Sequence, residues 1–272
     1  MTEFSPEAYY KHGTSLALYR PIGEMKDYWE AYWGQDDLKP LFDQARQGRL
    51  GEFEYPFSKY LPRDGVILEA GCGKGKYVCA LQARGYRIEG LDYAVETIER
   101  IRQAAPDLNV RVGDIYAIDR PDGHYDAYIS IGVMEHNFDG PEAALAEAYR
   151  VLCPGGIALI TVPYLNFPRR RLYRRVPEMH RLELGNGLRF YQDHVNVDHF
   201  ANCVQRAGFT ILDRIPYGLL GGLVRDWRLG RWLYSHHFFF YRVYQLISRS
   251  CKRAPLWLRK DLSHMLMFVC QK

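Results

Sequence analysis

The stretch Val66-Ile-Leu-Glu-Ala-Gly-Cys-Gly-Lys-Gly-Lys-Tyr77 decides the fold of this chain. A short apolar run meets an acidic residue, Glu69, and three glycines then follow at alternate positions before a segment of helical character. Glycines lack a Cβ atom, so a strand can turn sharply into a helix there and the backbone can approach a ligand closely. The stretch therefore predicts a strand, a ligand-binding loop and a helix, in that order.

Hydrophobic patterning around this stretch alternates between strand and helix from about residue 60 to residue 162. Proline and glycine at 154–156 predict a turn before the fifth strand. Such alternation predicts a parallel sheet with helices on both faces and right-handed crossovers. The predicted strands are 66–70, 87–91, 109–112, 125–131, 157–162, 209–215 and 264–271, and the predicted helices are 76–84, 95–104, 141–152 and 197–207.

Acidic residues recur where successive strands end. Asp92 closes the second predicted strand and Asp114 follows the third, as Glu69 closes the first. The carboxyl ends of parallel strands share one edge of a sheet, so we expect these carboxylates to surround one nucleotide-type pocket. Taken singly, each aspartate could equally cap a helix or lie at the surface. The loop also lacks the last spaced glycine of G-x-G-x-x-G, which disfavours a nicotinamide dehydrogenase.

Together these motifs resemble the class I S-adenosylmethionine-dependent methyltransferase superfamily. Residues 125–130, 132–136 and 147–156 are similar to the fourth-strand and fifth-strand motifs of its small-molecule branch. The resemblance implies an α/β, Rossmann-like fold with a seven-stranded, mostly parallel sheet. Its last two strands would pair, with the final strand antiparallel between its neighbours.

The same resemblance divides the chain into a core and additions. We expect the methyltransferase core at 61–162, 196–216 and 263–272. Residues 1–60 would form an N-terminal helical segment, and the insertions 163–195 and 217–262 a helical cap that selects the substrate.

The resemblance also implies roles in binding S-adenosyl-L-methionine. The glycine loop would pass beneath the methionine portion with its backbone N–H groups exposed, and Glu69 would bind the ammonium group. Asp92 would accept both ribose hydroxyls and Asp114 the adenine amine, with Ile115 against the ring. The expected cofactor-binding residues are Glu69, Gly71, Cys72, Gly73, Gly75, Asp92, Tyr93, Asp114, Ile115 and Ile131.

His136 is the candidate catalytic residue. It follows the fourth strand, whose end borders the methyl group in this fold, and an ordinary histidine pKa suits proton acceptance near neutrality. Alternatively, Glu135 and His136 form a structural pair beside the cofactor. A similar Glu-x-x-Glu-His segment of ubiquinone-pathway enzymes is associated with a metal, but Gly132 replaces its first glutamate, so no metal is expected. His194 and His199 are weaker candidates, and packing or surface roles are favoured for His199.

Composition narrows the partners. The net charge of +4 over 272 residues argues against wholesale nucleic-acid binding. Six scattered cysteines without C-x-x-C spacing, no signal-peptide pattern and no apolar run near ~20 residues indicate a cytoplasmic protein. A monomer or a homodimer is expected.

Three segments outside the core leave alternatives open. The arginines of 168–175 could clamp an anionic substrate, meet an anionic membrane or nucleic acid, or lie solvated. Aromatic residues at 28, 29, 32 and 33 have helical spacing, typical of a helix folded over the cofactor or of plain packing. The aromatic and basic stretch 217–248 suits a cap, a peripheral membrane contact or a dimer interface. The sequence thus predicts methyl transfer, at oxygen, to a small-molecule or lipid-linked acceptor; the alternative is a non-catalytic cofactor-binding scaffold.

Overall fold

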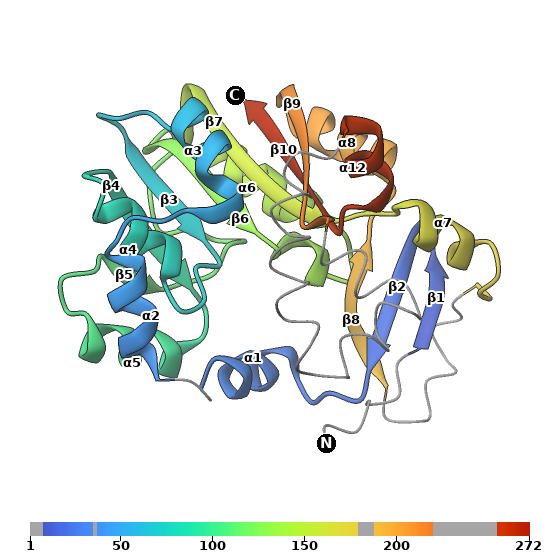
Figure 1. The fold of residues 1–272 in the computed structure, drawn as a ribbon, viewed down its shortest axis with the longest axis horizontal. Helices are drawn as coiled ribbons and strands as arrows, with labels where there is room; N and C mark the ends of the chain where they lie inside the picture. Colours follow the sequence, from blue (N-terminus) through green and yellow to red (C-terminus); the bar gives the residue numbers. More distant parts are fainter. Residues whose placement is uncertain (1–7, 35–36, 179–187, 220–254) are drawn as a thin grey trace.

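A seven-stranded sheet forms the centre of the protein, in the order β5-β4-β3-β6-β7-β10-β9 (Figure 1). The structure is a computed structural model that describes residues 8–34, 37–178, 188–219 and 255–272. Strands β5 to β7 of this order pair in parallel, whereas β10 is antiparallel to both β7 and β9. The expected topology is confirmed. The strands are β3 (Val66–Ala70), β4 (Arg87–Asp92), β5 (Val110–Val112), β6 (Tyr125–Ile131), β7 (Leu152–Pro163), β9 (Thr210–Tyr217) and β10 (Met265–Gln271).

Two apolar cores lie on opposite faces of this sheet. Successive side chains of a strand point to opposite faces, so Phe268 of β10 joins one core and its neighbours Met267 and Val269 join the other. The first core is covered by α6 (Glu142–Val151) and α8 (Val197–Arg206). The second is covered by α2 (Leu38–Ala45), α3 (Glu54–Tyr60), α4 (Lys76–Gln82) and α5 (Val95–Ala104).

The predicted turn at 154–156 is the main departure within the core. These residues lie inside β7, where the pairing of β6 with β7 shifts register. Gly155 has a positive φ of 81°, and its N–H donates to the carbonyl oxygen of Lys272 at 3.0 Å. The residues thus form an irregularity within a longer strand, because the last residue of the chain supplies the hydrogen bond that keeps them in the sheet.

The N-terminal segment is only partly helical, which corrects the expectation for 1–60. Strands β1 (Ala8–His12) and β2 (Ser15–Arg20) form an antiparallel hairpin. They precede α1 (Met25–Gly34), α2, the short helix η1 (Gly51–Phe53) and α3. All residues of β2 except the last are buried, so the strand shows no alternation of buried and exposed side chains.

Strand β8 (Arg189–His194) of the insertion 163–195 pairs with β2, which gives a second sheet in the order β1-β2-β8. Figure 1 shows this small sheet beside the large one, with blue β1 and β2 next to β8 from a distant part of the chain. The insertion is therefore not a purely helical cap. It folds together with the N-terminal hairpin, and this partnership brings β8 to the end of β6.

The basic helix α7 (Phe167–Tyr173) begins that insertion. Arg169 is only 4% exposed and donates to the carbonyl oxygens of Tyr164 at 2.9 Å and His264 at 3.0 Å. Arg170 pairs with Asp261 at 2.9 Å. Both side chains hold α7 against the segment before β10, so they do not form an anion clamp.

The second insertion is described at its edges alone. Residues 217–219 precede the undescribed part, and α12 (Leu256–Leu262) follows it. The predicted aromatic and basic surface at 220–254 lies outside the described residues. Within the described part of the chain, no helix combines the length and the apolar character that a membrane crossing requires.

Candidate functional site

A cavity of about 920 Å³ opens at the carboxyl ends of β3, β4, β5 and β6. Nine of the ten residues expected to bind the cofactor line it, and so does His136. Gly75 alone is not in the lining: it lies at the N-terminus of α4 with a positive φ of 71°, and a Cβ there would be 3.5 Å from Ile101. Gly75 thus forms the turn from the loop into α4 and does not line the cavity. The nine are Glu69, Gly71, Cys72, Gly73, Asp92, Tyr93, Asp114, Ile115 and Ile131.

The amides of the glycine loop differ from the expectation that they are exposed. The N–H groups of Gly71 and Cys72 both donate to the carbonyl oxygen of Leu91, at 2.8 and 3.0 Å. The Gly73 N–H donates to Asp92 Oδ2 at 2.8 Å. These three donors tie the loop to the end of β4, so its shape is set before any ligand binds. A ligand could therefore pack closely against the loop backbone, but these three amides already have acceptors within the protein.

Asp92 has two tasks at the end of β4. Its side chain is 5% exposed, and Oδ1 accepts from the Ala94 N–H at 3.0 Å while Oδ2 accepts from Gly73. Burial raises the pKa of this carboxyl above its usual value. A carboxylate oxygen has a second lone pair, so both oxygens can still accept a hydroxyl from the cavity.

Glu69 carries a buried oxygen without a partner. The side chain is 3% exposed, and its Oε2 atom finds no hydrogen-bond donor among the described residues. Burial raises the pKa of Glu69 to about 8. An unpaired polar atom buried in this way destabilises the empty site. A cationic donor in the cavity would satisfy it, and the ammonium group of an amino acid is such a donor.

The end of β5 presents Asp114 on an exposed turn. Its Oδ1 atom accepts from the Tyr116 N–H at 2.9 Å, which stabilises the turn. Ile115 is buried in the cavity wall next to it. The pairing of one carboxylate with one aliphatic surface suits a planar ring that also carries a donor.

Helix α1 closes the cavity from the side opposite the sheet. The rings of Trp29 and Trp33 stack, with centroids 5.4 Å apart, and both line the cavity. Trp33 lies over the glycine loop, so closely that a Cβ on Gly73 would be 3.2 Å from its ring. Of the two interpretations of these aromatic residues, the helix folded over the pocket is the one observed.

Two contacts attach α1 to α5. The Glu30 carboxylate accepts from the backbone N–H groups of Glu96 and Thr97 at 3.2 Å, in the first turn of α5. Arg100 donates to the Trp33 carbonyl oxygen at 3.0 Å. The closing helix is therefore fixed at the N-terminus of α5, where a carboxylate is favoured by the helix dipole.

His136 lies in the short helix η2 (Met134–His136), between two aromatic rings. The Trp29 and Tyr191 centroids are 5.0 and 4.9 Å from that of the imidazole. Its Nδ1 atom is 2.6 Å from the Tyr191 carbonyl oxygen. Burial lowers the pKa of His136 to about 4, so the expectation of a near-neutral pKa is wrong. Tyr191 was missed by sequence reasoning, because nothing in its segment marks it as a neighbour of η2.

The neighbouring Glu135 is buried and does not line the cavity. Its Oε1 atom is 4.0 Å from His136 Nε2, and its Oε2 atom finds no partner in the described part of the chain. Burial raises the pKa of Glu135 to about 8. The carboxyl is thus neutral near pH 7, and the proposed structural ion pair with His136 is weak.

The two weaker candidates lie elsewhere. His194 is buried, with Nδ1 3.1 Å from the Leu16 carbonyl oxygen, and holds β8 to β2. His199 is exposed on α8. Neither lines the cavity.

The comparison with known families identifies the kind of domain that contains this site. Residues 68–160, from β3 to β7, match the methyltransferase domain family. The chain carries a class I S-adenosylmethionine-dependent methyltransferase domain. The matched residues include the glycine loop, both aspartates and His136, and the family together with its S-adenosylmethionine-dependent relatives implies S-adenosyl-L-methionine as the cofactor.

Two curated relatives are similar to about a third of this chain. A protein of Mycolicibacterium smegmatis, described as a probable S-adenosylmethionine-dependent methyltransferase, is 34% identical over 97 residues, which are 36% of this chain and 37% of that protein. The malonyl-[acyl-carrier protein] O-methyltransferase of Serratia marcescens is 38% identical over 95 residues, 35% of this chain and 37% of that protein. The matched part thus spans little more than a third of either relative.

The fold of the methyltransferase domain also occurs in solved structures. An S-adenosylmethionine-dependent methyltransferase from Mesorhizobium loti superposes with a TM-score of 0.53 and 17% identity. The match covers 82% of this chain and 99% of that one. At this identity the likeness concerns the fold.

Proposed function

We propose that the protein transfers a methyl group from S-adenosyl-L-methionine to an oxygen of a small-molecule or lipid-linked acceptor. One observation carries this: the carboxylates that end three successive strands, the glycine loop and His136 surround a single cavity. The cofactor, when bound, supplies an electrophilic methyl group on a sulfonium, and the acceptor attacks it in line.

Each acidic residue takes one part of the cofactor in this proposal. The unpartnered Oε2 of Glu69 binds the ammonium, which relieves the cost of a buried unpaired atom. Asp92 accepts the ribose hydroxyls while it keeps the loop in place. Asp114 accepts the adenine amine, and Ile115 and Tyr93 pack beside the base and ribose.

The aromatic wall supports binding of a sulfonium. Trp29 and Trp33 line the cavity, and aromatic rings attract cations within about 6 Å of their centroids, as Lys74 Nζ at 5.3 Å from the Trp33 ring already illustrates. Their bulk also excludes water from the reacting atoms, and alignment in a dry site accounts for much of the rate gain of a bimolecular substitution.

His136 accepts the acceptor's proton at Nε2 in this proposal. Nδ1 faces a carbonyl oxygen, so it carries the proton and leaves the Nε2 lone pair free. A base with a pKa of about 4 is weak, but an attacking hydroxyl becomes strongly acidic as its new bond to carbon forms. Methylation of the acceptor hydroxyl by the bound cofactor would release one proton, and His136 Nε2 would hold it.

The acceptor is argued from the cavity and from the relatives. A volume of about 920 Å³ is near the upper end for ligand sites, which leaves space beside the cofactor. Lys26, Lys74 and Lys76 in the lining would suit an anionic acceptor as well as the cofactor carboxylate. The Serratia relative is named for O-methylation of an acyl-carrier substrate, which supports an oxygen acceptor. A cytoplasmic location without a nucleic-acid partner, as a monomer or homodimer with at most peripheral membrane contact, completes the proposal.

The deciding experiment has two stages. Calorimetric titration should give micromolar affinity for S-adenosyl-L-methionine and for its demethylated product, and none for NAD. Acceptors with hydroxyl or carboxylate groups are then screened for formation of the demethylated cofactor. Binding without turnover on any acceptor would favour the non-catalytic scaffold, and absence of binding would refute the assignment of the cavity.

A further inference from the structure

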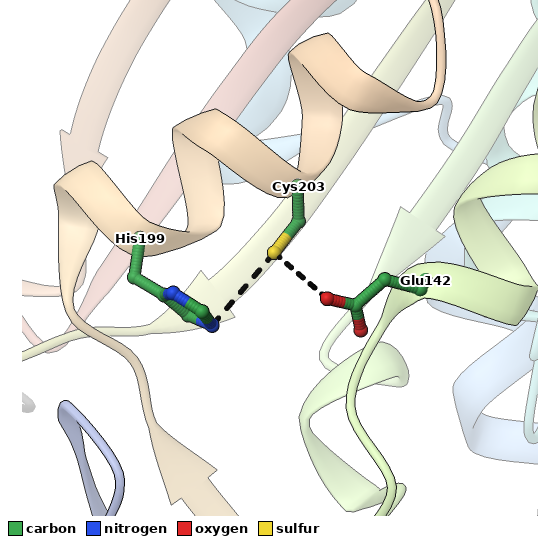
Figure 2. A group of neighbouring side chains, drawn as sticks. All are labelled: Glu142, His199 and Cys203. Carbon is green, nitrogen blue, oxygen red and sulfur yellow. Dashed lines mark hydrogen bonds between the residues drawn. The ribbon is translucent and has the colours of Figure 1, made fainter.

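A second group of reactive side chains lies away from the cavity, where α8 packs against α6. His199 and Cys203 come from α8, and Glu142 is the first residue of α6 (Figure 2). Residues four apart on a helix share one face, so the imidazole and the thiol point together toward α6. One donor atom from each of the three lies within 4.8 Å of the others.

The separations fit the coordination shell of one small cation. Cys203 Sγ is 3.8 Å from His199 Nε2 and 3.1 Å from Glu142 Oε1. With usual zinc bond lengths to sulfur, nitrogen and oxygen, a tetrahedral site places such donors about 3.6 Å apart. The two separations from sulfur are therefore within about half an ångström of that geometry, and the imidazole and the carboxylate, at most 4.8 Å apart, must move closer together.

We propose that Glu142, His199 and Cys203 bind one Zn²⁺, with a fourth position open to solvent. Thiolate and imidazole favour zinc over magnesium or calcium, which prefer oxygen ligands. Three protein ligands of the N, S and O types with an open fourth position are an arrangement that zinc adopts in proteins. No metal is expected from the sequence, because Gly132 replaces the first glutamate of the Glu-x-x-Glu-His segment and the cysteines lack C-x-x-C spacing. The three ligands proposed here come instead from two helices that are far apart in the sequence.

The surroundings allow an ion to enter. His199 lines a solvent-open depression of about 490 Å³ together with Asn202, Gln205 and Arg206. Cys203 is 1% exposed and Glu142 is exposed, and neither of them lines this depression. The site thus combines one buried soft ligand with two ligands that solvent can reach.

Arg206 is the competitor for this position. Its Nη2 atom is 3.3 Å from Cys203 Sγ and 3.4 Å from Glu142 Oε1. The guanidinium neutralises the carboxylate in the absence of metal, and it must swing away when a cation binds. Its side chain is 66% exposed, so little packing opposes that movement. Removal of the charge at position 206 should therefore strengthen metal binding.

Bound zinc would join two segments that lead to the methyltransferase cavity. Glu142 follows His136 by six residues, and His199 follows Tyr191 by eight. A metal bond between α6 and α8 would restrain both segments, so binding should raise the thermal stability of the full chain.

Metal titration of the full-length, chelator-treated protein under reducing conditions tests the proposal. Zn²⁺ affinity is measured by competition with a chromogenic chelator, and Co²⁺ replaces Zn²⁺ to report a thiolate-to-metal charge-transfer band. We expect one Zn²⁺ per chain, a higher melting temperature with Zn²⁺, and a thiolate band with Co²⁺. Glu142→Gln and Cys203→Ser should each weaken binding at least tenfold, and Cys203→Ser should remove the band.

Two variants serve as controls. Cys153→Ser alters a half-buried cysteine that contacts Asp126 instead, so its zinc affinity should equal that of the wild type. Arg206→Gln should tighten binding several-fold. The exposed Glu142→Gln change preserves the fold, so its result stands even if Cys203→Ser is unstable. Binding weaker than millimolar, or a site unaffected by Glu142→Gln and Cys203→Ser, would overturn the proposal without bearing on methyl transfer.

Discussion

The Nδ1 atom of His136 lies 2.6 Å from the carbonyl oxygen of Tyr191, and this contact joins η2 of the methyltransferase domain to β8 of the small sheet. A carbonyl oxygen can only accept, so the contact assigns the imidazole proton to Nδ1. The lone pair is thereby left on Nε2, which lies 4.0 Å from Glu135 Oε1, and the His136 side chain lines the cavity. A residue from the first insertion thus orients the candidate base in the core.

Replacement of His136 tests the proposed base. His136→Gln keeps a side chain of similar length between Trp29 and Tyr191 but removes the basic nitrogen. For a hydroxyl acceptor we expect kcat to fall by about 10²–10⁴-fold, the range for a general base. The dissociation constant of the cofactor, measured by calorimetry, should change less than threefold. Full activity on a hydroxyl acceptor would remove His136 from the mechanism, whereas a carboxylate acceptor needs no base.

The pH dependence of kcat is a separate test of the same residue. Burial lowers the pKa of His136 to about 4, so the free imidazole is neutral throughout the range above pH 5. We expect no loss of kcat between pH 8 and pH 6 that traces to this group. A limb near pH 6.5 that disappears in His136→Gln would contradict the buried environment described here.

The core of the fold could be predicted because its signals are local. The strand 66–70, the helix 95–104 and the strand 125–131 coincide with β3, α5 and β6. Each depends on near-neighbour patterns: a short apolar run, helical spacing of aliphatic residues, or glycine where a strand turns. The pocket residues followed, because consecutive parallel strands must end at one edge.

The small sheet could not be predicted because its signal is not local. Pairing of β2 with β8 joins residues about 175 positions apart in the chain, and nothing in either segment specifies the other. Tyr191 lines the cavity from β8, at the point where the register shift between Leu18 and Tyr19 leaves it without a paired residue in β2. The same holds for burial: the sequence shows a histidine at 136 but not the two rings that lower its pKa.

Glu69 should oppose folding at alkaline pH. Its pKa of about 8 in the folded chain exceeds the ordinary 4.5, so between these values the folded state holds a proton that the unfolded state has released. This stabilising term is full below about pH 4.5 and is lost as pH rises to about 8. Glu69→Gln does not titrate, so its free energy of unfolding at pH 8 should exceed that of the wild type, by at most about 5 kcal/mol for this pKa rise, with a higher melting temperature.

Glu135→Gln is the matched control for that variant. Burial raises the pKa of Glu135 to about 8 as well, but this residue does not line the cavity. Both variants should therefore gain stability at pH 8, as measured by thermal unfolding at pH 5 and pH 8. Only Glu69→Gln should lose cofactor affinity, by at least tenfold. Equal cofactor affinities in the two variants would refute the ammonium-binding role of Glu69.

Replacement of Trp33 should lower the affinity for the cofactor more than it lowers the stability of the fold. It stacks on Trp29 and covers Gly73 from an exposed helix that has no fully buried residue. Trp33→Ala removes a ring face from the cation site, worth about 0.5–2 kcal/mol, so cofactor affinity should fall about 3–30-fold. The melting temperature without cofactor should move little. The control is Tyr55→Ala, which truncates an exposed ring outside the cavity and should leave cofactor affinity unchanged.

Asp92 and Asp114 both lie where a strand ends at the cavity, but their substitution should have unequal effects. Asp92 is buried and holds Gly73 and Ala94, whereas Asp114 is exposed and holds only the turn at Tyr116. Asp92→Ala should weaken cofactor binding at least tenfold, about 1.4 kcal/mol, and should also lower the melting temperature of the free protein, because two backbone donors lose their acceptor. Asp114→Ala should weaken binding less and leave the melting temperature nearly unchanged.

Asp92→Asn separates the two effects, because its amide oxygen can still accept one of the backbone hydrogen bonds while the second ribose acceptor is lost. Unchanged affinity in both Asp92 variants would show that the carboxylate serves the loop alone.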